Sequence, residues 1–245
     1  MERKEFLKRG LSALGMATVV PLMSACTKSV DPITTTGTTT SSGSTNGTAG
    51  GSCTVTPTET EGPFPTKSPA SWVRKDIRSD RTGIIMTANI TIVNKNTNCG
   101  ALTGALVDIW HCDADGNYSE YGGTGMQSTN YTSVDFLRGR QTTDASGLAA
   151  FTTIFPGWYG GRAPHIHVHI YNSSGKSLLV TQIAFPKDIC DTVYTTATSF
   201  YKKGKQDTTN ETDNVFSDGF TTELATVSGS IASGYALTHT IVVNG

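Results

Sequence analysis

Short runs of β-branched and aromatic residues, separated by clusters of Gly, Asn, Asp and Ser, constrain the fold of this chain more than any other feature. Seven runs have the composition and length of strands: 84–93, 105–111, 148–155, 165–171, 178–185, 223–228 and 236–243. No long amphipathic helix stands out. We therefore predict an all-β fold, an antiparallel β-sandwich of about seven or eight strands with long loops. Residues 53–245 are enough to bury one sizeable core as a single domain.

Residues 1–26 have the organisation of an export signal. A charged start that includes Arg3 and Lys4 precedes an apolar run that is too short, and too interrupted by Pro21, to span a bilayer stably. The run LMSAC at 22–26 resembles a bacterial lipoprotein cleavage box, so Cys26 is predicted to carry a lipid. We expect an exported protein of the cell envelope, attached to a bacterial membrane only through Cys26. The RKEFLK run resembles a twin-arginine signal with Lys4 in place of the second arginine, and an uncleaved signal anchor is the alternative.

The segment 27–52 separates this signal from the rest of the chain. Nineteen of its 26 residues are Ser, Thr or Gly, a composition that cannot bury a core and stays flexible. We predict a disordered tether with a mean span of roughly 28 Å. A folded domain at its end could stand clear of a membrane surface.

The charge balance and the cysteines restrict the classes of function. With 19 basic and 20 acidic residues, the chain has no field that would steer nucleic acid to it, and we expect no nucleic-acid partner. The four cysteines after Cys26 predict one or two disulfides in an oxidising compartment, with three full pairings open: Cys53, Cys99, Cys112 and Cys190. Their spacings match no iron–sulfur motif.

Two histidines and two tyrosines in the middle of the chain form a candidate metal site. His165 and His167 are two residues apart, so on a strand their imidazoles share one face, with Cα atoms about 6.6 Å apart. His169 extends this face, and the spacing alone allows the pair 165/167 or 167/169. Phenolates of Tyr118 and Tyr159 together with imidazoles suit ferric iron better than zinc or ferrous iron, which favour other ligand sets.

Five runs resemble the intradiol ring-cleavage dioxygenases, the family that includes catechol and protocatechuate dioxygenases. Their order and spacing both match, and the resemblance covers about residue 53 to residue 245. The runs are TETEGPFP (58–65), VDIWHCDADGNYS (107–119), FLRGRQTTDASG (136–147), FTTIFPGWYGGRAPHIHVHI (151–170) and LLVTQIAFP (178–186). The resemblance implies the same β-sandwich core that the strand pattern predicts.

The resemblance also implies a site and a reaction. It implies Fe(3+) bound by four side chains, of which Tyr118 stays bound and Tyr159 is released when substrate arrives: Tyr118, Tyr159, His165 and His167. His169 has no counterpart among these ligands. Arg162 matches the arginine that steadies negative charge on the substrate ring, and Gln182 matches a glutamine that touches the ring. The implied substrates are an aromatic diol and O2, with cleavage between the two hydroxyl-bearing carbons to give a muconate-type diacid.

Several alternatives remain open from the sequence. The DADG (113–116) and DASG (144–147) runs are predicted to be turns, with Asp115-Gly116 as a turn pair between two strands, and His111 is predicted not to be a ligand. A non-enzymatic cell-surface sandwich for binding or display, with ordinary packing roles for the Tyr and His residues, is the competing hypothesis. Extradiol cleavage by ferrous iron would need a carboxylate ligand. The particular diol is not predicted, because specificity in the family depends on loop contacts that the sequence does not show. The oligomeric state is not predicted either, because the tether occupies the place of the helical dimerisation region that some members carry.

Overall fold

The computed structural model describes residues 53–123 and 125–245. The predicted export signal, the lipidated Cys26 and the predicted tether at 27–52 lie outside the described residues. Within the described ranges, no helix has the length and apolar character needed to cross a membrane.

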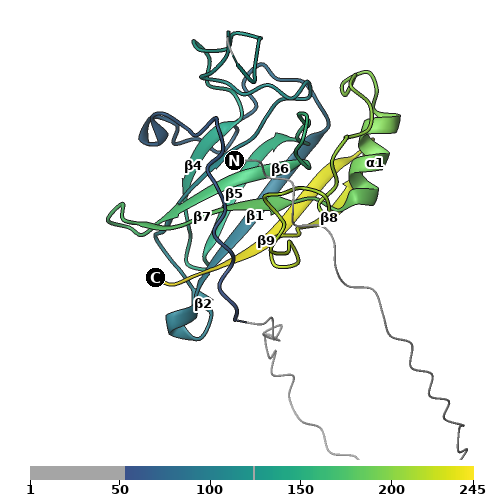
Figure 1. Cartoon of the computed structure of the whole chain (residues 1–245). Coiled ribbons are helices and arrows are strands. Elements are labelled where there is room, and N and C mark those ends of the chain that lie inside the picture. Colours follow the sequence, from purple (N-terminus) through teal and green to yellow (C-terminus); the bar gives the residue numbers. More distant parts are fainter. Residues whose placement is uncertain (1–52, 124) are drawn as a thin grey trace, which may run out of the picture. The chain divides into compact units, whose positions relative to one another are not determined.

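In this part of the chain, nine strands form two sheets (Figure 1). One sheet has the order β2-β1-β9-β8, and β5 also pairs with β1. Its strands are β1 (Ile85–Asn94), β2 (Gly100–Ala101), β5 (Leu148–Ile154), β8 (Thr226–Ser230) and β9 (Gly234–Val243). The other sheet has the order β4-β3-β6-β7, made of β3 (Leu106–Trp110), β4 (Arg138–Thr142), β6 (His165–Tyr171) and β7 (Ser177–Ala184). Two short 3-10 helices, η1 (Pro69–Ser71) and η2 (Lys95–Thr97), and one α-helix, α1 (Lys187–Thr196), complete the elements.

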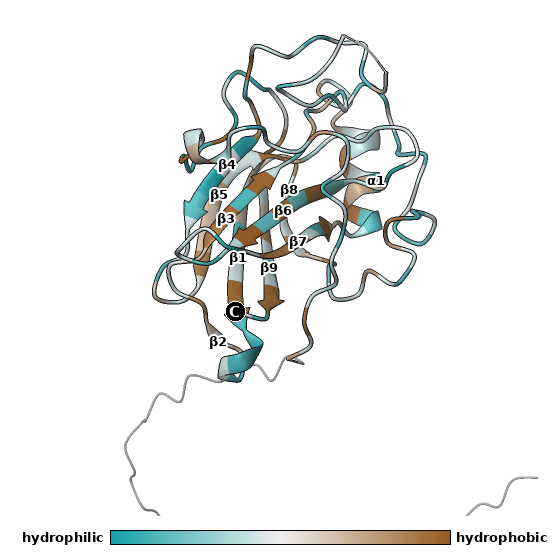
Figure 2. Cartoon of the chain, turned by 60° about the vertical axis from the view of Figure 1, so that its left-hand side comes forward, coloured by the Kyte–Doolittle hydropathy of each residue, from teal (hydrophilic) through white to brown (hydrophobic). Residues whose placement is uncertain are grey.

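The core lies between the two sheets because apolar residues alternate along the strands. In β1, Met86, Ala88, Ile90 and Ile92 are buried while the residues between them are more exposed, the period-2 pattern of a strand with one buried face. Figure 2 shows apolar segments on β1 and β9, apolar and polar segments alternating along β6, and a largely polar β4. β6 differs, because its buried residues fall on both faces. Its inner face packs in the core, and its outer face carries His165 and His167.

All seven predicted strands are present, and the differences from the prediction lie in polar or short segments. β4 has the sequence RGRQT, which lacks apolar alternation, and β2 has only two residues. The helix α1 was not predicted, since its sequence KDICDTVYTT has few apolar residues. The sheets are also not wholly antiparallel, because β1 and β9 pair in parallel.

Both predicted turns form. Gly147 N donates to Asp144 O at 3.0 Å in the connection between β4 and β5, and Gly116 N donates to Asp113 O at 3.0 Å. Gly116 has φ +86°, a left-handed conformation that glycine adopts without steric cost. The predicted central pair Asp115-Gly116 was wrong, because the bond from Gly116 N to Asp113 O makes Ala114 and Asp115 the central residues of this turn. The turn lies early in the long connection 111–137 between β3 and β4, and that connection also carries Tyr118.

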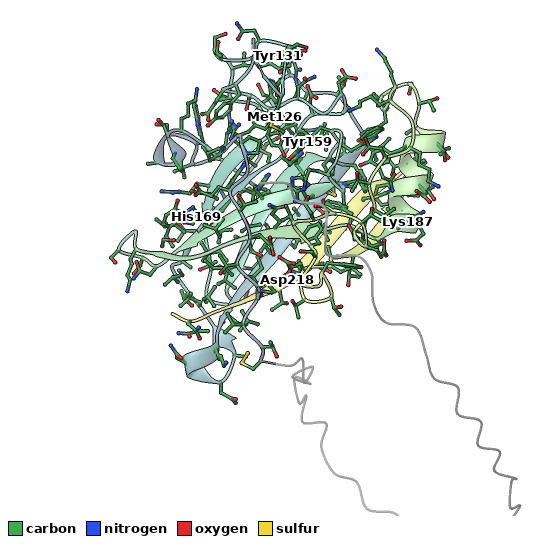
Figure 3. The ribbon with its side chains drawn as sticks, in the orientation of Figure 1. Met126, Tyr131, Tyr159, His169, Lys187 and Asp218 are labelled. Atoms are coloured by element: carbon green, nitrogen blue, oxygen red, sulfur yellow. A yellow bond between two sulfur atoms is a disulfide. The ribbon has the colours of Figure 1, made fainter. Side chains whose placement is uncertain are left out.

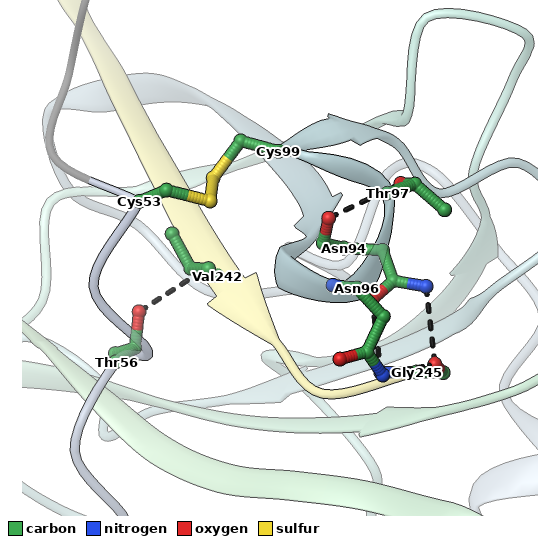
Figure 4. Close-up of a disulfide and its surroundings, with 8 residues drawn as sticks. All are labelled: Cys53, Thr56, Asn94, Asn96, Thr97, Cys99, Val242 and Gly245. Carbon is green, nitrogen blue, oxygen red and sulfur yellow. Dashed lines mark hydrogen bonds between the residues drawn. A yellow bond between two sulfur atoms is a disulfide. The ribbon is translucent and has the colours of Figure 1, made fainter.

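A disulfide fixes the start of the described domain. Cys53 and Cys99 are bonded, whereas Cys112 and Cys190 are free and buried. One bridge was among the predicted possibilities, and the structure selects this pair (Figure 4). Residues 53–66, which begin at this disulfide, form the segment that we call the N-terminal strap.

The strap runs from one sheet to the other. Thr56 exchanges two hydrogen bonds with Val242 of β9, each 3.0 Å long (Figure 4). Further on, Glu59 N donates to Val180 O of β7 at 2.9 Å. The strap therefore passes from β9 to β7, and its residues 60–64 reach the outer face of the second sheet, where His165 and His167 lie.

Candidate metal centre

The outer face of β6 brings two imidazole nitrogens together. The Nε2 atoms of His165 and His167 are 3.1 Å apart, and both side chains are buried. The carbonyl oxygen of Ala163 lies 2.6 Å from His165 Nδ1. Because a carbonyl only accepts, His165 Nδ1 carries the proton and the lone pair of Nε2 points toward His167. Two alternate residues of a strand thus aim ring nitrogens at one place, as their spacing predicts.

Two phenols point to the same place from different loops. The hydroxyl oxygens of Tyr118 and Tyr159 each lie 3.5 Å from His165 Nε2. Tyr118 is fully buried, and Tyr159 is only partly buried. Tyr118 is held by a reciprocal pair of bonds, in which its N donates to Gln127 Oε1 at 2.6 Å and Gln127 Nε2 donates to its carbonyl at 2.8 Å. The structure therefore brings all four predicted ligands together.

His169 belongs to a different cluster. Its Nδ1 lies 3.0 Å from Glu61 Oε1, its Nε2 lies 2.8 Å from Ser177 Oγ, and its ring stacks on Tyr171 with centroids 4.0 Å apart. Figure 3 shows His169 well away from Tyr159. Of the two pairs that the spacing allows, only 165/167 thus faces the phenols. His111 also lies elsewhere, between the Cys112 carbonyl at 2.9 Å and Thr153 Oγ1 at 2.7 Å.

Burial sets the protonation of the four donors. It lowers the pKa of His165 to about 3, with the Arg162 cation adding to the effect, and it lowers the pKa of His167 well below its usual range. Both imidazoles are therefore neutral and can act as ligands. Burial, with Tyr159 nearby, raises the pKa of Tyr118 well above its usual range, so this phenol ionises at neutral pH only beside a strong positive charge.

This donor set fits a hard, highly charged cation. In the described ranges, no group of three or more His, Cys, Asp or Glu side chains could hold a metal, so any metal here depends on the phenols as well as on the two imidazoles. Two converging neutral nitrogens and two phenol oxygens in a buried site suit a trivalent ion, which would also overcome the raised pKa of Tyr118. The residues present therefore fit Fe(3+).

Arg162 and Gln182 lie beside these donors and bind one another. Gln182 is opposite His167 in the pairing of β6 with β7. Arg162 Nη2 donates to Gln182 Oε1 at 2.6 Å, and Gln182 Nε2 donates to the Thr60 carbonyl of the strap at 2.9 Å. These two bonds define which end of the Gln182 amide faces Arg162.

Aromatic rings and the strap close the site around the four predicted ligands. Trp110 stacks on His167 with centroids 4.9 Å apart and an interplanar angle of 4°, and Phe64 stacks on Tyr118 at 4.8 Å. Gly62 has φ +67°, and a Cβ atom there would lie 2.9 Å from His167 Cε1. The strap therefore contacts His167 at a position where only glycine fits without displacement.

Sequence reasoning did not identify several residues that hold this site in place. Among them are Gln127, which holds Tyr118, and Asp213, which accepts from Arg162 Nε at 2.9 and 3.0 Å. Neither lies in a recognisable motif. The strap residue Thr60 falls in the TETEGPFP run, which resembles the family without indicating a role for its carbonyl.

Comparisons with known proteins agree with this architecture. A family model described as Dioxygenase matches residues 65–219, more than half of the chain. Catechol 1,2-dioxygenase 1 from Acinetobacter lwoffii is 31% identical in a match that covers 31% of this chain and 29% of that protein. The chain therefore spans less than a third of the length of this curated relative.

Two solved structures match over most of their length. An intradiol ring-cleavage dioxygenase from Tetranychus urticae has a TM-score of 0.69 at 28% identity, with 78% of this chain and 95% of that chain covered. The dioxygenase domain of a dioxygenase carbohydrate-binding protein fusion from Streptomyces sp. SirexAA-E has a TM-score of 0.55 at 27% identity, with 77% and 97% covered. The family model, the sandwich and the converging tyrosines and histidines lead to one conclusion: this chain belongs to the intradiol ring-cleavage dioxygenase family.

Proposed function

We propose that this protein is a ferric dioxygenase that cleaves the aromatic ring of a catechol-type diol between its two hydroxyl-bearing carbons. Both atoms of O2 enter the product, a muconate-type diacid, so substrate plus O2 equals product. The observation that carries the proposal is the convergence of two phenol oxygens and the Nε2 atom of His167 on His165 Nε2, at 3.1 to 3.5 Å. This arrangement also favours an enzyme over the display hypothesis, since packing alone does not require four donor atoms to converge.

The residues fall into distinct roles in this proposal. Tyr118, Tyr159, His165 and His167 would hold Fe(3+), which when bound would acidify the diol and allow it to react with O2. Tyr118 is fully buried and fixed by Gln127, so it suits a permanent ligand. Tyr159 is only partly buried, so it suits the ligand that leaves. Its freed phenolate oxygen can then accept a proton from an incoming diol hydroxyl.

Arg162 supplies fixed positive charge at the same place. Its guanidinium is buried, and it opposes the rise that burial imposes on the pKa of Tyr159. A cation in that position stabilises negative charge on the bound diol and on the Tyr159 oxygen alike. Gln182 fixes the Nη2 end of this guanidinium and lies opposite His167, so it is well placed to line the substrate pocket.

The location of this activity is a second part of the proposal. The charged and apolar pattern of residues 1–26 and the LMSAC run support export to the cell envelope and attachment through a lipid on Cys26. Mass spectrometry of the protein from a bacterial membrane fraction would detect the lipidated N-terminal Cys26. An unprocessed N-terminus in soluble protein would contradict this part without affecting the proposed chemistry.

The proposed reaction is tested first with protein reconstituted with iron. Protein reconstituted with ferric iron is expected to be red-brown through tyrosinate-to-iron charge transfer, to consume O2 with a panel of catechols, and to give products heavier by two oxygen atoms. Tyr118→Phe should lose the colour or shift it strongly. Tyr171→Phe is the matched control, because Tyr171 lies on the same strand as the two histidines but contacts His169 instead. Colourless protein that binds no iron would support the display hypothesis, and a yellow semialdehyde product would support extradiol cleavage.

A further inference from the structure

Asp213 is a buried carboxylate at the back of the candidate site. It lies in the loop between α1 and β8, about fifty residues beyond the histidines in sequence, and its side chain is fully buried. Buried carboxylates are stable only when they are paired or fully hydrogen-bonded. The hydrogen-bond partners of Asp213 therefore indicate its structural role.

The partners of Asp213 are concentrated on one segment, the loop that carries the site. Its two oxygens accept from Arg162 Nε at 2.9 and 3.0 Å. The backbone N of Ala163 donates to Oδ2 at 2.7 Å, and the N of Val215 donates to Oδ1 at 2.9 Å. Asp213 thus joins its own loop to two consecutive residues of the 159–165 segment. That segment contains Tyr159, Arg162 and His165.

The Ala163 peptide passes this constraint on to a histidine. Its N–H is bound to Asp213, and its carbonyl oxygen accepts the proton of His165 Nδ1 at 2.6 Å. A shift of the peptide would therefore turn the His165 ring. On the other side, Nε of Arg162 is bound to Asp213 and Nη2 is bound to Gln182. The guanidinium plane is thus fixed at both ends.

We propose that Asp213 is the positioning residue of this site, which fixes the Arg162 guanidinium toward the bound diol and Tyr159 and holds the Ala163 peptide that orients His165. The proposal rests on the proposed function for its effect on turnover. The Asp213–Arg162 pair itself is formed by protein atoms alone. Asp213 acts through Arg162 and Ala163, so its removal should impair the chemical step more than the binding of the diol.

Asp213→Asn tests the pair directly. The amide nitrogen of asparagine replaces one acceptor oxygen with a donor, so at least one bond to Arg162 or to a backbone amide is lost. Asp218→Asn is the matched control, since it makes the same charge change at an exposed position in the same loop. In iron-loaded protein we expect kcat of Asp213→Asn to fall on the order of a hundredfold. We expect KM, iron content and the visible band to stay close to those of the control, because the remaining amide oxygen of asparagine can still accept from the Ala163 N–H and keep His165 in place.

A double-mutant cycle with Arg162→Ala separates positioning from general loop stability. If Asp213 acts through Arg162, Asp213→Asn should cost less than about threefold in kcat once Arg162 is absent. If the two losses multiply, or if Asp213→Asn stays within twofold of Asp218→Asn in active protein, the proposal is overturned. Should wild-type protein with iron consume no O2 with any diol, the proposed function fails instead.

Thermal unfolding of the metal-free variants gives a readout that needs neither iron nor turnover. Asp213→Asn leaves Arg162 buried without its carboxylate, a strongly destabilising state. The double variant Arg162→Gln/Asp213→Asn removes that unpaired cation and should recover most of the lost melting temperature. The same comparison applies if Asp213→Asn does not fold. A double variant as unstable as the single one would show that Asp213 serves only the backbone amides, contrary to the proposal.

Discussion

Removing the Cys53–Cys99 disulfide should lower the stability of the domain without changing its native structure. The bridge joins residues 46 positions apart, and closing a loop of that length in the unfolded chain corresponds to about 4 kcal/mol in the chain-entropy model. In the folded state, the strap that begins at Cys53 is also held by Thr56 on β9 and by Glu59 on β7. These contacts should keep the strap in place when the covalent bond is absent.

The assay is urea unfolding of oxidised wild-type protein and of the Cys53→Ser/Cys99→Ser variant, with the unfolding free energy extrapolated to water. We expect a loss of about 3 to 4 kcal/mol, together with unchanged kcat under conditions where both proteins are folded. Each single serine variant should lose nearly as much as the double variant, because either one breaks the bond. A loss below about 1 kcal/mol would refute the argument, and a fall in kcat would show that the non-covalent contacts do not hold the strap.

Three further predictions concern the site and its surroundings. Gly62→Ala should weaken iron binding, because the added Cβ atom would contact His167. Gly175 has a similar positive φ with open space around it, so the control Gly175→Ala should cost only about 1 kcal/mol of backbone strain. Equal iron affinity in the two variants would contradict this prediction. Arg162→Ala should keep iron and colour but lower kcat by roughly 10²- to 10³-fold, and undiminished turnover would remove its assigned role. Burial raises the pKa of Glu223 to about 8, so the contribution of Glu223 to folding stability is complete below its ordinary pKa near 4.5 and is lost as pH rises toward 8. Glu223→Gln should flatten this pH dependence of the unfolding free energy by up to about 1.4 kcal/mol per pH unit. Urea unfolding from pH 5 to 8 measures the effect, with the exposed Glu211→Gln as control.

The strands were predictable because their pattern is local. Residues 165–171 alternate between a core-facing and an outward-facing set, and the period of two by itself placed His165 and His167 on one face. The resemblance to the family then indicated which tyrosines join them. β4 was not predicted because it lacks the apolar alternation of a strand. Its first residue, Arg138, is buried through hydrogen bonds to the carbonyl of Phe64 and to Ser119 rather than through apolar packing.

The remaining features depend on contacts between distant segments that leave no local pattern. The parallel pairing of β1 with β9 joins residues about 150 positions apart, and neither strand's sequence indicates its partner or direction. Asp213 is one of 20 acidic residues in the chain, and only the folded structure distinguishes it as the partner of Arg162. The carbonyl of Thr60 is still less visible, because a backbone acceptor has no residue-type signature.

The position of β9 has a consequence for how this domain is made. In the described chain β9 is the last strand in sequence, yet it lies inside its sheet, between β1 and β8. Until β9 emerges during synthesis, one long edge of β1 has no neighbour and can pair with another chain instead. We therefore expect nascent or C-terminally shortened chains to aggregate, and full-length chains to refold slowly for their size, as proteins with many non-local pairings do.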